Sequence, residues 1–123
     1  MRHTNGEMQQ MLESLRPLLE RRDIIGYAAA RNSRILRVEL TEFLERRDEL
    51  VMKYGEADVD EEGNPTGQVS LKMTSPNLPA FANELQRYSS ITHEFEPFRI
   101  KYDEAIGQLS GTELLSVEWM FED

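Results

Sequence analysis

The 123-residue sequence contains no cysteine, two histidines and one tryptophan. Without cysteine, the chain can form no disulfide, no thiolate zinc site and no cysteine nucleophile. No segment approaches the roughly 18 consecutive apolar residues that a membrane span needs, so we expect no membrane partner. The polar N-terminal residues are not followed by an apolar stretch of the kind that export signals contain, and we therefore expect a cytoplasmic protein, in a bacterial, viral or other host.

Motifs that would indicate an enzyme are also missing. There is no Gly-x-Ser-x-Gly, no Ser-x-x-Lys and no glycine-rich phosphate loop. Residues 58–63 resemble the start of a calcium loop, but Val69 stands where that loop requires a glutamate. His93 and the neighbouring Glu94 would point to opposite sides of a strand and so would not converge on one ion. We expect no catalytic residues, no metal and no cofactor.

The first half of the sequence has the apolar spacing of helices. Apolar residues between 6 and 22 fall on one helical stripe, which Pro17 should kink or break, and Asn5 is a plausible N-cap. Residues 24–54 keep a period close to 3.6 and contain no proline, so we expect one long helix of about 28 residues, or about 42 Å.

The second half is mixed. Residues 56–68 hold five acids, two glycines and a proline, which predicts an acidic loop. Residues 69–73 and 95–102 have strand-like alternation, and we expect them to pair with each other or with a second chain. Ser110 and Glu113 have the spacing of a capping box, which predicts a C-terminal helix.

These patterns predict a mainly α fold with a minor β element, of the α+β class. We expect a long antiparallel helical pair, short strands and a C-terminal helix. One domain should span residues 1–123, with a helical half at 6–55, the acidic loop at 56–68 and a mixed half at 69–123. A stripe this long exceeds what one small chain covers, so we expect a homo-oligomer, a dimer or higher.

The acidic charge is divided unevenly along the chain. The net charge is −9, yet residues 1–54 carry 10 of the 14 basic groups and are close to neutral, with a net charge of +1. Residues 55–123 carry −10. Whole-surface binding of nucleic acid is therefore not expected, and the arginines of the first half are the natural place for an anionic ligand.

The candidate binding residues lie in the predicted long helix. Tyr27, Arg31 and Arg34 are spaced by three and four residues, so they share one helix face that could hold a phosphate-bearing ligand or an acidic partner. The alternative is that these arginines are neutralised by acids of the same chain. Asn32 and Arg47 fall on or beside the apolar stripe, where a polar residue either sets register and partner choice or extends its head to solvent.

The sequence also resembles a family of short proteins of unknown function encoded by tailed phages and prophages, mostly of Gram-positive bacteria. The resemblance is carried by the order of several segments: Gly-Tyr-Ala at 26–28, Ala-Arg-Asn at 30–32, residues 39–47, Lys-Tyr-Gly-Glu at 53–56, Asp-Glu-Glu-Gly-Asn-Pro at 60–65, and the later segments 80–85, 95–100 and 114–120. It covers roughly residues 20–122 and implies a phage or prophage origin and a small helical fold. It brings no activity and no catalytic residues.

Three functions are compatible with the sequence. The first is a non-enzymatic phage accessory protein that acts by protein binding or assembly with a phage or host protein. The second is an anti-defence protein that binds a host immune protein or sequesters a phosphate-bearing nucleotide signal. The third is a metal-dependent hydrolase subunit that uses the carboxylates of the chain.

Overall fold

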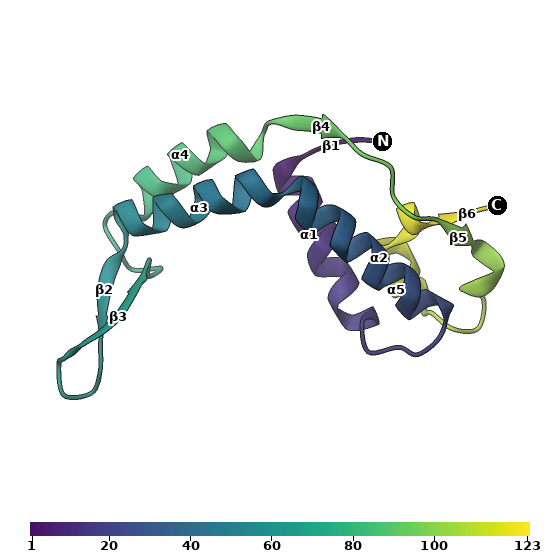
Figure 1. The fold of residues 1–123 in the computed structure, drawn as a ribbon, viewed down its shortest axis with the longest axis horizontal. Helices are drawn as coiled ribbons and strands as arrows, with labels where there is room; N and C mark the ends of the chain where they lie inside the picture. Colours follow the sequence, from purple (N-terminus) through teal and green to yellow (C-terminus); the bar gives the residue numbers. More distant parts are fainter. The chain divides into compact units, whose positions relative to one another are not determined.

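The computed structural model describes residues 1–123 and is mainly α with a minor β element, as the sequence predicts (Figure 1). None of its helices combines the length and the apolar character that crossing a membrane requires. Short 3-10 turns lie at Arg16–Leu18, Tyr102–Glu104 and Glu118–Met120. The five helices are α1 (Asn5–Leu15), α2 (Ile24–Glu39), α3 (Thr41–Tyr54), α4 (Leu78–Ser89) and α5 (Gly111–Ser116).

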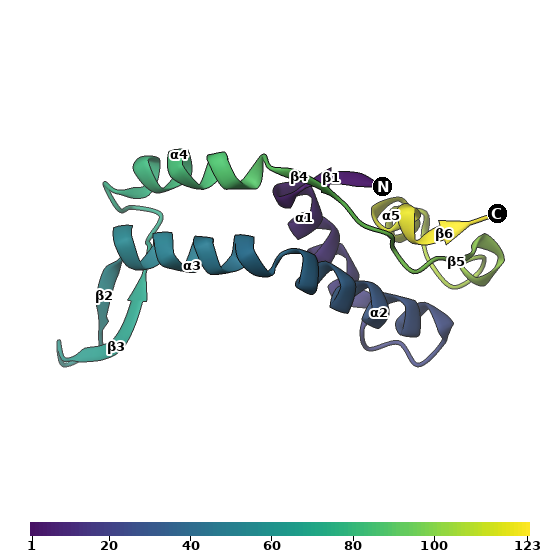
Figure 2. The ribbon, with the colours of Figure 1, turned by 45° about the horizontal axis from the view of Figure 1, so that its top comes forward.

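The chain forms two compact units, which we describe separately. Unit 1 consists of Met1–Leu40 and Thr92–Asp123, and unit 2 consists of Thr41–Ile91. Unit 1 therefore joins the two ends of the chain, a division that differs from the helical, acidic and mixed parts suggested by the sequence. The predicted long antiparallel helical pair is replaced by two shorter pairs, α1 with α2 and α3 with α4, which run antiparallel in both ribbon views (Figures 1 and 2).

Helix α1 begins and ends where local chemistry dictates. Its N-cap is Thr4 rather than the expected Asn5, because Thr4 and Glu7 form a reciprocal capping box. Backbone and side-chain hydrogen bonds to Thr4 lower the pKa of Glu7. The helix ends at Leu15 and a 3-10 turn follows, so the predicted interruption at Pro17 is confirmed.

The long helix expected over residues 24–54 is wrong, because it is interrupted at Leu40. Leu40 is the C-cap of α2, with φ −91° and ψ 0°, and α3 starts at the next residue. Leu40 is fully buried, and its amide still donates to the Leu36 carbonyl oxygen at 2.9 Å. No proline or glycine marks this interruption, and the apolar spacing continues across it. The sequence therefore gives no sign that the helix ends here.

The core of unit 1 lies between α1, α2 and the C-terminal segment. Its fully buried apolar side chains are Met8, Leu15, Ile25, Ala28, Ala29, Leu36, Leu40, Val117 and Met120. Gly26 allows a close approach of the preceding loop, because a Cβ there would lie 2.0 Å from the Arg21 carbonyl oxygen. The predicted capping box of the C-terminal helix is confirmed, with Ser110 as the N-cap of α5 and Glu113 as its partner.

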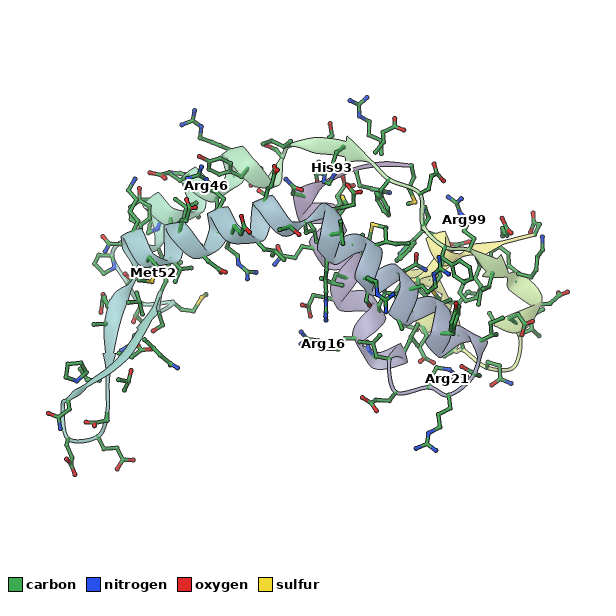
Figure 3. All side chains as sticks on the ribbon, viewed as in Figure 1. Arg16, Arg21, Arg46, Met52, His93 and Arg99 are labelled. Atoms are coloured by element: carbon green, nitrogen blue, oxygen red, sulfur yellow. The ribbon has the colours of Figure 1, made fainter.

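The strands of unit 1 pair differently from the prediction. Strand β1 (Arg2–Thr4) pairs antiparallel with β4 (Thr92–Glu94), and β5 (Ile100–Lys101) pairs parallel with β6 (Phe121–Glu122). His93, labelled in Figure 3, is half-buried and not solvent-facing. Its Nδ1 lies 3.1 Å from Glu39 Oε2 and its Nε2 lies 2.8 Å from Asn5 Oδ1, so it ties β4 to both α1 and α2.

The predicted acidic loop is largely a β-hairpin in unit 2. Residues 56–68 largely form an antiparallel hairpin of β2 (Glu56–Val59) and β3 (Pro65–Ser70), which closes within unit 2. The expected pairing of residues 69–73 with 95–102 is therefore wrong. The hairpin forms because Asp60 closes a tight turn: its amide donates to the Asn64 carbonyl oxygen at 2.8 Å, and Gly63 adopts a positive φ of 85°.

A polar bridge joins the two helices of unit 2. Lys53 Nζ donates to Glu84 Oε1 at 2.8 Å, and the Tyr54 hydroxyl donates to the same oxygen. The Lys53 hydrogen bond, followed by that of Tyr54, lowers the pKa of Glu84. Nearer the middle of α3, the guanidinium of Arg46, labelled in Figure 3, lies 5.2 Å from the ring centre of Tyr88 on α4. Buried apolar side chains are few in this unit, only Phe43 and Leu50.

Candidate interaction surface

Helix α2 divides its side chains between two opposite faces. The inner face is buried and includes Ala28, Ala29, Asn32 and Leu36. Steps of three and four residues place Ile24, Tyr27, Arg31, Arg34 and Val38 on the opposite side of the helix, where each is exposed. The predicted proximity of Tyr27, Arg31 and Arg34 on one face is consistent with this helix, which runs without interruption from residue 24 to residue 39.

Phe98 lies beside this face and contacts two of its members. The guanidinium carbon of Arg31 is 4.7 Å from the centre of the Phe98 ring. The Tyr27 ring meets the Phe98 ring edge-on, with centres 5.8 Å apart and planes at 74°. Arg31 Nη1 also donates to the Tyr27 hydroxyl at 3.5 Å. We call Tyr27, Arg31, Arg34 and Phe98 the arginine face.

Asn32 holds Phe98 in this position. Asn32 Nδ2 donates to the Phe98 carbonyl oxygen at 2.8 Å, and the Phe98 amide donates to Asn32 Oδ1 at 2.7 Å. The side chain is only 1% exposed, so of the two alternatives for Asn32 the structure favours a fixed, buried role over one in solvent. Its amide acts as a double clip that anchors residues 97–99 to α2.

The charges of Arg31 and Arg34 are not neutralised within unit 1. Neither guanidinium forms an ion pair or a hydrogen bond with a carboxylate of that unit, whereas Arg21, in the same unit, pairs with Asp23. The Arg21 hydrogen bond holds the pKa of the Asp23 carboxyl below its usual range. Glu39, which follows on α2, is paired with His93. The alternative in which these two arginines are paired with nearby acids therefore finds no support in unit 1.

Arg47 does not join this face. It lies on α3 in unit 2, is half-buried, and forms an ion pair with Asp48 at 3.5 Å. Among the five predicted binding residues, three lie on the arginine face. Asn32 lies on the buried side of α2 and anchors Phe98, which belongs to that face. The exposed Arg22 and Arg2 of unit 1 are likewise without carboxylate partners, but they do not share the α2 face.

Two surface cavities of unit 1 lie elsewhere. One, of about 270 Å³, is lined by His3, Glu7, Met11 and Trp119 among others. Glu7 is already engaged there by the capping box and by His3 Nδ1 at 3.5 Å. The other, of about 230 Å³, has an acidic lining that includes Asp23, Asp103 and Glu104. No group of three or more histidine, aspartate or glutamate side chains is arranged to hold a metal ion.

Sequence reasoning missed Phe98 as part of the surface. It lies 67 residues after Arg31, in a segment whose alternation predicted a strand, and no local pattern indicates its contact with α2. The only available signal was Asn32, a polar residue at a position of the apolar stripe. In comparisons with family models, with curated proteins and with solved structures, none matches this chain.

Proposed function

We propose that this chain is a non-enzymatic accessory protein of a phage or prophage that acts by binding an acidic protein segment on the arginine face. One observation carries the proposal: Arg31 and Arg34 are exposed without carboxylate partners, beside an exposed tyrosine and a fixed phenylalanine. Isolated charges on a protein surface are common, but arginine and tyrosine together are the side chains that most often dominate protein–protein interfaces.

The exposed apolar residues of α2 support a protein partner over a small ligand. On the exposed side of α2, Ile24 and Val38 lie near the two ends of the helix and are 43% and 68% exposed, and Tyr27 is 56% exposed. Small ligands favour concave sites that bury most of their surface, whereas these residues stand on the outside of a helix. A second macromolecule would cover the apolar residues and supply carboxylates to the arginines at the same time.

The anti-defence alternative uses the same residues. A phosphate-bearing signal would be held by Arg31 and Arg34, and an aromatic base could stack on Tyr27. The phage origin rests on the sequence resemblance alone. The metal-dependent hydrolase is not proposed, because no specific observation favours it.

The proposal is tested with a fluorescein-labelled peptide of six glutamates, followed by fluorescence anisotropy. The ionic strength is about 0.15 M, so that long-range repulsion by the acidic chain is screened beyond about 8 Å. We expect the double variant Arg31→Ala/Arg34→Ala to weaken binding about tenfold, because two charge-assisted contacts are lost. Arg2→Ala/Arg22→Ala removes the same charge from exposed arginines of the same unit and is the matched control.

Equal weakening by the two double variants would contradict the proposal, because the peptide would then respond only to net charge. Inorganic pyrophosphate serves as the probe for the alternative. Binding of pyrophosphate that depends on Arg31 and Arg34, without binding of the glutamate peptide, would favour a phosphate-bearing ligand.

A further inference from the structure

The β2–β3 hairpin of unit 2 has the features of a segment that lies against a partner. All of its residues from Val59 to Gln68 are exposed, and Val59 alone leaves 59% of its surface in solvent. A two-stranded hairpin is marginally stable in water when nothing covers it. The unit that carries it also buries few apolar side chains, so the hairpin gains little support from a core.

The end of the hairpin is acidic and its turn is fixed. One carboxylate oxygen of Asp60 accepts from the amides of Glu62 and Asn64, both at 2.9 Å. Asp60 is therefore engaged in holding the turn. The carboxylates of Glu61 and Glu62 are exposed and form no ion pair or hydrogen bond. No lysine or arginine occurs between residues 54 and 71, so these charges have no basic neighbour within the hairpin.

The arginine face of unit 1 has the complementary composition. Arg31 and Arg34 are unpaired cations one helical turn apart, and the exposed Tyr27 and Val38 lie on the same side of α2. Glu61 and Glu62 are equal in number and opposite in charge to the two arginines. The exposed apolar Val59 could contact Tyr27 and Val38. Both surfaces belong to the same chain, so a second copy supplies each with a partner without any additional component.

We infer that the arginine face of one copy binds the β2–β3 hairpin of a second copy, with Glu61 and Glu62 placed against Arg31 and Arg34. This inference rests on the proposed function and names its acidic partner. The contact joins two different surfaces, so it is either exchanged reciprocally by two copies, which gives a dimer, or repeated from copy to copy, which gives a larger assembly. The energetically important part is the tyrosine and arginine cluster, and the hairpin brings the charges that steer association.

A charge-swap experiment by sedimentation equilibrium tests the contact. The first variant, Arg31→Glu/Arg34→Glu, makes the face acidic, and the second, Glu61→Lys/Glu62→Lys, makes the hairpin basic. Each variant alone sets like charges against each other and should raise the dissociation constant of self-association by about a hundredfold. Mixed in equal amounts, the two variants again present opposite charges in every contact, and association should return.

Matched variants control for net charge. Arg2→Glu/Arg22→Glu changes the charge of unit 1, and Glu42→Lys/Glu45→Lys changes the charge of unit 2, in each case at exposed residues outside the two surfaces. Both should associate as the unaltered chain does. Circular dichroism at 222 nm verifies that all variants are folded.

Three results would overturn the inference: an unaltered chain that stays monomeric, swap variants that associate alone, or a mixture that does not associate. The glutamate-peptide experiment separates this failure from failure of the proposed function. If the peptide still binds through Arg31 and Arg34 while the chain is monomeric, the face binds an acidic segment of another protein.

Discussion

Asn32 shows how one buried polar side chain can position a surface. Both of its polar groups are used by the backbone of a single residue, Phe98, at 2.7 and 2.8 Å. Leaving a buried donor or acceptor without a partner costs more free energy than a hydrogen bond contributes. Asn32 and the backbone of Phe98 therefore depend on each other for their hydrogen bonds. The clip keeps the Phe98 ring beside Arg31 and Tyr27, and the ring contacts both of these exposed side chains.

Replacing this amide should therefore destabilise unit 1. Asn32→Ala removes both hydrogen bonds and leaves the amide and carbonyl of Phe98 without them, which should lower the free energy of unfolding by about 1–3 kcal/mol. Urea denaturation followed by circular dichroism measures this change. Asn83→Ala is the matched control, since Asn83 is exposed on α4 and should change stability by less than about 0.5 kcal/mol. Equal effects of the two substitutions would show that Asn32 is not an anchor.

At the scale of elements, α3 and α4 are joined by polar contacts more than by a core. Helix α4 has no fully buried residue, and its link to α3 includes Glu84, which accepts from both Lys53 and Tyr54. The Glu84 hydrogen bond raises the pKa of Lys53, and hydrogen bonding to Glu84 followed by burial raises the pKa of Tyr54. All three shifts indicate that the pairing favours ionised Glu84, charged Lys53 and a neutral tyrosine.

These shifts predict a pH-dependent contribution to the stability of unit 2. Because the folded pKa of Glu84 lies below its usual value of 4.5, its stabilising contribution is complete above that value and is lost as the pH falls through the folded pKa. Glu84→Gln should therefore lower the melting temperature at pH 7, and the difference from the unaltered chain should shrink below about pH 4.5. Thermal unfolding at a series of pH values provides the measurement.

The control for this experiment is Glu45→Gln, which removes the same charge from an exposed position of α3. In an acidic chain this substitution should not lower the melting temperature. If Glu84→Gln behaves like Glu45→Gln at every pH, the bridge does not stabilise the pairing of the two helices.

Local chemistry was predictable from the sequence, and long-range pairing was not. The interruption at Pro17 and the capping box at Ser110 follow from one or a few neighbouring residues, and both are confirmed. The break at Leu40 has no proline or glycine to announce it, and the apolar spacing persists across it. The pairing of β1 with β4 joins residues about 90 positions apart, for which the alternation of single strands holds no information.

The candidate site was partly predictable for the same reason. Helical spacing alone places Tyr27, Arg31 and Arg34 together, because they lie on one continuous helix. Arg47 was expected, like Asn32, on or beside the apolar stripe of one long helix, and the break places it on α3, in unit 2. Phe98 is distant in the sequence and is brought to the face by the tertiary structure and by its hydrogen bonds with Asn32. The position of Asn32 in the apolar stripe was the only sign of this contact in the sequence.

For the whole molecule, the uneven division of charge is the feature that connects the structure with the proposed function. The net charge of −9 conceals a first half that is nearly neutral and a second half that carries −10. The structure localises this contrast further, to two arginines without carboxylate partners near the anchored Phe98, and to a hairpin with two exposed glutamates, Glu61 and Glu62. The net charge does not conflict with the proposed binding of an acidic segment, because screening confines the repulsion to short distances.

The most direct test of the arginine face is the location of a bound acidic segment. A peptide of six glutamates with a nitroxide spin label is added to the ¹⁵N-labelled chain, and the loss of each amide signal is measured by NMR. The largest losses are expected at Tyr27, Arg31, Arg34 and Phe98, and the variant Arg31→Ala/Arg34→Ala should show no such losses there. Losses of equal size around Arg2 and Arg22, or losses centred outside α2, would contradict it.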